Sequence, residues 1–186
     1  NNYLALQALW EDARRRGADE VFFLGDTGGF GPFPDRSVEL LRSLPIRAMA
    51  GNYDVSVAAA LADCGCGYTD PRDNNFARLS YDYTLAHTSA ENRYWLATLP
   101  AALRIEHAGY RLLMVHGSPR RTNEFLWKST SPLALIDHLC AEAGVDRICC
   151  THTGLHWQQT TPSGKGIINV GAIGRPARSE EHTSEL

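Results

Sequence analysis

The apolar residues of this chain alternate between helical spacing and short continuous runs. Residues 4–16 carry apolar side chains three and four positions apart, as in an amphipathic helix, and Gly17 supplies its end. The next apolar stretch, 21–24, is short and continuous, which is typical of a strand covered on both faces. A helix over 35–43 and a second buried strand over 46–49 follow. This strand–helix–strand order predicts an α/β domain with a largely parallel sheet.

The rest of the chain predicts more helices and two hairpins without an internal repeat or a linker. We expect a surface loop over 63–75. The other expected elements are helices over 55–62, 76–86, 91–99 and 132–143, and strands over 103–107, 111–115, 147–150, 157–160 and 167–169. No apolar run is as long as a membrane span. We therefore expect one domain and no membrane partner.

Composition and charge narrow the function classes. The 186 residues are 44% hydrophobic and 21% charged, which excludes a disordered chain. A formal net charge of −3 gives no global attraction to nucleic acid, so no specific nucleic-acid binding is indicated. The cysteines are odd in number and lack paired CxxC spacing, which argues against a disulfide scaffold and a zinc–thiolate site. We expect all of them to be small buried residues of a reducing cytoplasm: Cys64, Cys66, Cys140, Cys149 and Cys150.

Four polar residues each stand just after the apolar part of a predicted strand. They are Asp26, Asn52, His116 and His152. In an α/β sheet such positions gather at one edge, where ligands bind. A carboxylate, an amide carbonyl and two imidazoles suit a divalent ion such as Mn²⁺, Fe²⁺ or Zn²⁺. A single histidine after a strand is usually only hydrogen-bonded, but four such residues in glycine-flanked loops indicate a metal site.

These residues lie in sequence blocks that resemble the ordered motifs of calcineurin-like metallophosphoesterases, in particular the small bacterial phosphodiesterase branch. The blocks are Gly25-Asp26 with the glycine-rich loop to Pro32, Gly51-Asn52-Tyr53-Asp54, Val115-His116-Gly117, Thr151-His152-Thr153 and Asn169-Val-Gly-Ala-Ile173. The resemblance implies an α/β fold with a two-sheet β-sandwich flanked by helices. It also implies two divalent metals, with Mn expected first and Fe, Zn or Ni as alternatives. By the same resemblance Asp26 is the bridging carboxylate, and Asn52, His116 and His152 complete the second metal's ligands.

The chain departs from the family pattern at several points. The first metal should also use an Asp-x-His at the end of a preceding strand, and Asn1-Asn2 resembles the sequence just after it. Gly154 stands where the family has a second histidine, and His156, two residues on, is an alternative metal ligand. We therefore expect an incomplete domain over 1–177 with little activity as it stands. The last nine residues, 178–186, match a translated sequencing adapter, so His182 is not counted as a ligand.

Three residues of the second block are the catalytic candidates. Asn52 can bind a metal through its carbonyl and leave its amide free to steady phosphate. Tyr53 replaces a histidine that protonates the leaving group in many phosphatases, and a phenol is a poor general acid at neutral pH. Asp54 is expected to hold the loop as a hydrogen-bond acceptor, or else to cap the next helix. Arg175, beside the expected site, is a candidate for binding substrate phosphate.

The expected function is hydrolysis of phosphate esters by a metal-activated water in a cytoplasmic protein, most simply as a phosphodiesterase acting on a small molecule. Two alternatives stay open. One is a phosphomonoesterase or protein phosphatase, which Tyr53 disfavours. The other is a binding or scaffold module that keeps the fold with an eroded metal site, which Gly154 suggests. The oligomeric state is left open.

Overall fold

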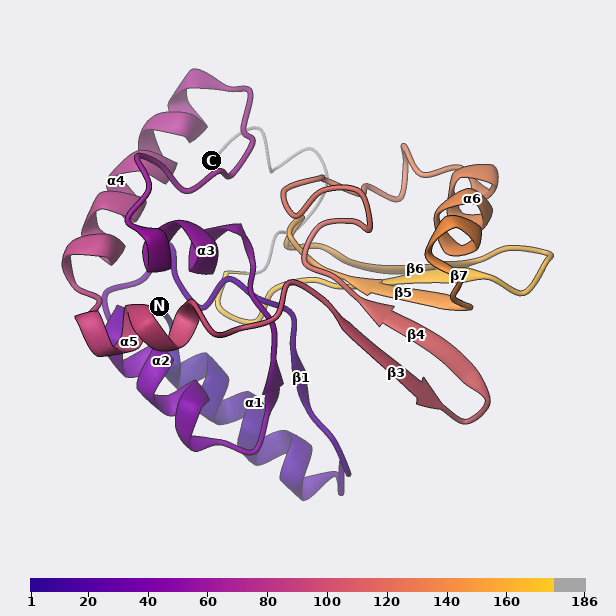
Figure 1. Ribbon diagram of the computed structural model, residues 1–186, viewed down its shortest axis with the longest axis horizontal. Helices are drawn as coiled ribbons and strands as arrows, with labels where there is room; N and C mark the ends of the chain where they lie inside the picture. Colours follow the sequence, from indigo (N-terminus) through magenta and orange to yellow (C-terminus); the bar gives the residue numbers. More distant parts are fainter. Residues whose placement is uncertain (176–186) are drawn as a thin grey trace.

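The computed structural model describes residues 1–175, in which five helices form one half and a large sheet with one helix forms the other (Figure 1). The helices are α1 (Tyr3–Arg15), α2 (Pro34–Ser43), α3 (Asn52–Ala59), α4 (Pro71–Ala86), α5 (Ala90–Leu96) and α6 (Leu133–Ala143). The strands are β1 (Phe22–Phe23), β2 (Arg47–Ala48), β3 (Leu103–His107), β4 (Tyr110–Met114), β5 (Arg147–Cys150), β6 (His156–Thr160) and β7 (Gly166–Val170). The expected tail 178–186 and His182 lie outside the described residues.

The strands form two sheets. Strands β1 and β2 pair in parallel, next to the helices α1 to α5. The second sheet has the order β3-β4-β5-β7-β6, with parallel pairing through β4, β5 and β7 and an antiparallel strand at each edge. The expected two-sheet α/β fold with flanking helices is therefore confirmed. Within residues 1–175, no helix combines the length and apolar character that crossing a bilayer requires.

Three groups of buried side chains hold these layers together. One lies between the large sheet and α6, around Ile136, Leu139 and Ile148. A second lies among the four helices α2, α3, α4 and α5. The third is small and joins the two sheets through Leu24, Met49 and Met114. Leu24 directly follows β1 and Met114 ends β4, so this third group fixes the strand ends from which the polar loops emerge.

Two helices begin earlier than the apolar pattern predicts. Helix α3 starts at Asn52, three residues before the expected start, so the second sequence block is itself the first helical turn. Helix α4 starts at Pro71, inside the expected loop over 63–75. The Asp70 side chain accepts from the backbone of Arg72 and Asp73, and Pro71 has the fixed φ that suits a first helical position. Because the first turn of α4 is polar, the spacing of apolar residues does not reveal where this helix begins.

The expectation that all five cysteines are unpaired is wrong for two of them. Cys64 and Cys66 form a disulfide, with their Cα atoms 5.2 Å apart. Gly65 between them has a φ of +59°, which lets the chain turn back over so short a span. Cys140, Cys149 and Cys150 are free, as expected.

Thiol counting under denaturing conditions tests this pairing. We expect three reactive thiols, from the free cysteines, before reduction and five after treatment with a dithiol reductant. The Cys64→Ser/Cys66→Ser double variant should give three thiols in both conditions. Five thiols in the unreduced wild-type chain would mean that the loop forms without the disulfide.

Candidate metal centre

Asp26, His116 and His152 come together at the ends of three strands. Asp26 follows β1, His116 follows β4 and His152 follows β5, and one ligand atom from each lies within 4.8 Å of the others. Asp26 Oδ2 is 3.1 Å from His116 Nε2, and the same nitrogen is 3.1 Å from His152 Nδ1. The fold thus joins residues of the helical half to residues of the large-sheet half in one cluster.

The orientation of His116 leaves one ring nitrogen facing the cluster. Its Nδ1 lies 2.7 Å from the backbone carbonyl oxygen of Leu24, to which it donates a hydrogen bond. In the neutral imidazole this assigns the proton to Nδ1 and leaves the Nε2 lone pair toward Asp26 and His152. A backbone carbonyl that fixes the tautomer in this way is the usual support of a metal-binding histidine.

Two of the residues predicted as metal ligands each have one buried polar atom with no hydrogen-bond partner among the described residues. One is Nε2 of His152 and the other is Oδ1 of Asn52. The Asn52 amide nitrogen donates to the carbonyl oxygen of Cys64 at 2.8 Å, so the carbonyl oxygen is the free end of this side chain. Leaving such atoms unpaired is costly unless a ligand satisfies them. The residues present therefore fit a divalent ion with mixed oxygen and nitrogen ligands.

Asp26 and His152 are in the protonation states that bind a metal, whereas the charge and hydrogen bond of Asp26 outweigh burial and raise the pKa of His116, so a metal ion would compete with a proton there. Burial alone would raise the pKa of Asp26, but the charge and hydrogen bond of His116 outweigh it and hold the pKa below its usual value. Burial, with the neighbouring His116, lowers the pKa of His152 to about 4. Asp26 is therefore a carboxylate and His152 a neutral imidazole near pH 7, as metal ligation requires.

Asp54 connects the loop of Asp26 to the start of α3. Its Oδ2 accepts from the backbone N–H of Asp26 at 2.7 Å and of Gly51 at 2.9 Å, and its Oδ1 accepts from Thr27 N–H at 2.9 Å. Burial and the charge of Asp26 raise the pKa of Asp54 to about 6. The structure places Asp54 where both expected roles meet, because it holds the loop and also accepts from the residue before the helix.

The same two loops approach too closely for any side chain but hydrogen at two positions. A Cβ on Gly25 would lie 2.3 Å from the Gly51 nitrogen, and a Cβ on Gly51 would lie 2.1 Å from Asp26 Oδ1. Gly25 also has a φ of +92°, which disfavours other residues. This contact sets the carboxylate of Asp26 against the first turn of α3, where Tyr53 N–H donates to Asp26 Oδ1 at 3.0 Å.

Asn169 supports the loop that carries His152, a role that sequence reasoning did not assign. Its side-chain nitrogen donates to the Thr151 carbonyl oxygen and to Thr153 Oγ1, and its Oδ1 accepts from Gly171 N–H at 3.0 Å. The side chain is buried and both ends are used. The resemblance of Asn169–Ile173 to a family block was the available signal.

Tyr53 lines the cavity with its ring, whereas His156 is outside both the cavity lining and the metal-ligand cluster. The Tyr53 hydroxyl donates to the Ala77 carbonyl oxygen at 3.3 Å, and the ring packs against Tyr81 in the helical core. The hydroxyl of Tyr53 is therefore hydrogen-bonded within the helical half. His156 is exposed at the start of edge strand β6 and is outside the metal-ligand cluster, while Gly154 lines the adjacent cavity.

A cavity of about 570 Å³ opens over the cluster. Its lining includes Asp26, His116 and His152 together with Arg175, the expected phosphate-binding candidate. The Arg175 guanidinium lies 3.9 Å from the centre of the Phe30 ring. The site thus combines a candidate metal-ligand cluster and the positive charge of Arg175 in one concave surface, which suits the binding of an anion.

Comparison with family models identifies the class. The model described as the calcineurin-like phosphoesterase superfamily domain matches residues 1–185, and the chain belongs to this superfamily. The resemblance drawn from the sequence blocks is confirmed. A curated relative, an uncharacterized protein of Methanocaldococcus jannaschii, is 28% identical over 132 residues, which are 71% of this chain and 51% of the relative. The chain therefore spans about half the length of this relative.

Solved structures agree with this fold. A metallophosphoesterase from Sphaerobacter thermophilus is 27% identical, with a TM-score of 0.67, over 94% of this chain and 74% of that chain. A hypothetical protein from Pyrococcus horikoshii has a TM-score of 0.73 at 19% identity, over 93% of this chain and 73% of that chain. The second likeness shows the fold alone.

Proposed function

We propose that this chain is the catalytic region of a metal-dependent phosphodiesterase whose metal ligands are Asp26, Asn52, His116 and His152. The observation that carries this proposal is the Asp26–His116–His152 cluster, whose ligand atoms lie within 4.8 Å of one another in the lining of the cavity. The buried Oδ1 of Asn52, which lacks a hydrogen-bond partner among the described residues, supports Asn52 as a further ligand. Mn²⁺ is the proposed ion, since the mixed oxygen and nitrogen donors suit it.

A bound divalent ion would supply an activated water and a positive charge for the phosphate oxygens. The chain's own residues do the rest. Leu24, through its carbonyl, keeps the His116 lone pair toward the site, and Asp54 keeps Asp26 in place. Arg175 binds a phosphate oxygen from the cavity wall, where its charge adds to transition-state stabilisation.

The surroundings of Tyr53 support a diester or another substrate with a good leaving group. The hydroxyl of Tyr53 donates its hydrogen bond to the Ala77 carbonyl oxygen, and burial raises the pKa of this hydroxyl further above the ordinary value of a tyrosine. A phenol so placed cannot protonate a departing alkoxide near pH 7. An unactivated monoester would lack the general acid that it needs, whereas a diester with an acidic leaving alcohol would not.

The second candidate function is a binding module with an eroded site, and Gly154 is the observation that favours it. Gly154 lines the cavity without contributing a side chain, so one expected ligand is absent from that position. Metal-dependent turnover distinguishes the two functions.

The test is Mn²⁺-dependent hydrolysis of bis(p-nitrophenyl) phosphate, with p-nitrophenyl phosphate as the monoester comparison. We expect little turnover by the chain as it stands. The same chain with an added N-terminal strand ending in Asp-x-His should hydrolyse the diester faster than the monoester. A chelator should remove this activity and Mn²⁺ should restore it. A folded, metal-loaded chain with that strand and no turnover would favour the binding module.

A further inference from the structure

One wall of the cavity is built from aromatic side chains that the proposed chemistry does not use. Phe30, Tyr68, Phe76 and Phe125 all line the cavity that contains the metal-ligand cluster. Phe30 and Phe76 are 37% and 43% exposed, although both line the cavity. Large exposed rings around a concave site indicate a ligand that covers them.

Ring contacts and the shared cavity connect most of this wall into a strip that ends at the metal-ligand cluster. The Phe125 ring lies 4.3 Å from the His152 ring and 5.8 Å from the Tyr68 ring, measured between centroids. Tyr68 and Arg175 line the same cavity. Arg175 in turn lies over Phe30. The strip is therefore Phe30, Arg175, Tyr68 and Phe125.

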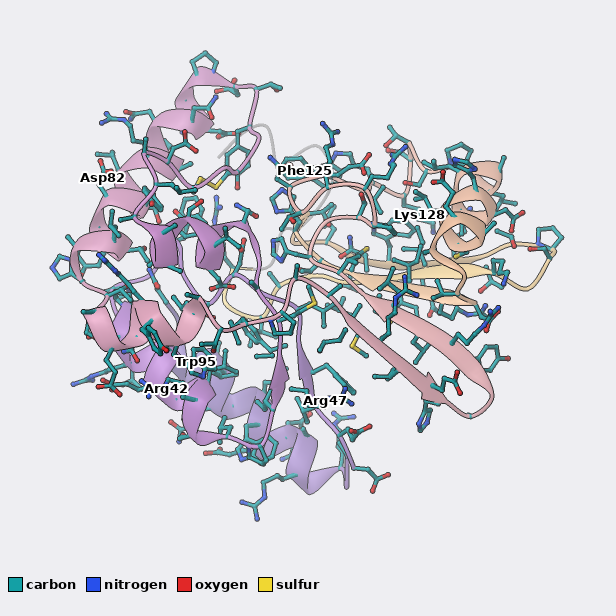
Figure 2. The ribbon with its side chains drawn as sticks, viewed as in Figure 1. Arg42, Arg47, Asp82, Trp95, Phe125 and Lys128 are labelled. Atoms are coloured by element: carbon teal, nitrogen blue, oxygen red, sulfur yellow. A yellow bond between two sulfur atoms is a disulfide. The ribbon has the colours of Figure 1, made fainter. Side chains whose placement is uncertain are left out.

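The position of the strip relates it to the reacting phosphate. Phe125 lies on the loop after His116, at the side of the large-sheet half that faces the helices (Figure 2). Phe30 lies on the loop after Asp26, so the two rings come from opposite halves. The strip begins at a proposed metal ligand, and Arg175, the proposed phosphate contact, is part of it. A group attached to the phosphate would consequently lie along these rings.

We propose that the strip is a subsite for a planar aromatic ring carried by an ester group of the substrate, so that the preferred substrates are aryl or nucleoside phosphodiesters. This inference rests on the proposed function. Stacking rewards a flat ring over a saturated ring of similar size, because the ring faces attract edges and faces of other aromatic groups. Arg175 serves both parts of such a substrate, since its charge faces an anion and its plane stacks on a ring.

The test measures binding by calorimetry, without turnover, on the full chain. The probes are diphenylphosphinate and dicyclohexylphosphinate, monoanions of similar size that have no ester bond to hydrolyse. We expect diphenylphosphinate to bind several-fold more tightly. Phe30→Leu and Phe125→Leu should each weaken its binding about three- to tenfold and change dicyclohexylphosphinate binding less than about twofold. Phe33→Leu is the matched control, because Phe33 is 39% exposed but lies outside the cavity.

Each outcome decides the proposal. Equal affinity for the two phosphinates, no binding of either, or an equal effect of Phe33→Leu would overturn it. A third probe, thymidine 5′-methylphosphonate, distinguishes the two sources of the ring: sensitivity to Phe30→Leu supports nucleoside esters, and insensitivity supports aryl esters. Titrations with Mn²⁺ and with chelator separate this inference from the proposed function. A ring preference in this chain, together with no Mn²⁺-dependent hydrolysis by the chain that carries the added Asp-x-His strand, would keep the subsite and reject the diesterase.

Discussion

Replacement of His152 by alanine is expected to remove metal-dependent turnover and metal binding together. A metal at such a site supplies several kcal/mol of transition-state stabilisation. Since about 1.4 kcal/mol is a factor of ten in rate, the loss should be on the order of 10³-fold or more. The measurements are diester hydrolysis by the chain with the added Asp-x-His strand, and the rise in thermal stability that Mn²⁺ gives to the chain. At a metal concentration of 100 times Kd that rise corresponds to about 2.7 kcal/mol in the wild-type chain.

His156→Ala is the matched control for this experiment. His156 is exposed on β6, two residues after Gly154, and it was the alternative ligand from the sequence. We expect its replacement to leave both turnover and Mn²⁺ stabilisation unchanged. Unaltered turnover in His152→Ala would remove His152 from the proposed mechanism. A loss of Mn²⁺ stabilisation in His156→Ala would instead make His156 a ligand.

Asp54→Ala should give the largest loss of stability among the substitutions considered for this site. It leaves three buried backbone N–H groups, of Asp26, Thr27 and Gly51, without their acceptor. Each orphaned donor costs about 1–3 kcal/mol, so the free energy of unfolding should fall by about 3 kcal/mol or more. Urea denaturation measures this change.

Two comparison variants show whether the loss comes from these hydrogen bonds. Asp54→Asn keeps the shape and one acceptor oxygen, so its loss should be smaller, about 1–3 kcal/mol. Asp82→Ala removes an exposed carboxylate that pairs only at 3.8 Å with Arg78, and we expect a change within about 0.5 kcal/mol. An Asp54→Ala variant as stable as Asp82→Ala would mean that solvent replaces the acceptor.

The sequence predicted the parts of the fold and site that depend on local pattern. The apolar runs before Asp26, His116 and His152 are strand ends, and strands that run in parallel bring such ends to one edge. Asn52 follows the same logic, although its helix starts at that residue rather than later. The proximity of Asp26, His116 and His152 could therefore be expected from the sequence.

The remaining features depend on contacts between distant residues, which no local pattern contains. The Tyr53 hydroxyl finds its acceptor at Ala77, on a helix whose orientation is set by the packing of the helical core. Asn169 supports a loop about twenty residues earlier in the chain. The Cys64–Cys66 disulfide lacks the spacing used to recognise paired cysteines. Such partners are fixed by tertiary packing.

The hydrogen bond from His116 to the Leu24 carbonyl crosses between the two halves of the molecule. The small apolar group around Met49 and the ring contact of Tyr68 with Phe125 also join the two halves. An ion bound by Asp26 of the helical half and by His116 and His152 of the large-sheet half would cross-link the two halves. Binding and folding would then be coupled, because ligands separated by more than a hundred residues meet only after both halves are formed. Loss of the metal would therefore increase amide hydrogen exchange first where the two halves meet. The buried amides inside each half would keep their protection.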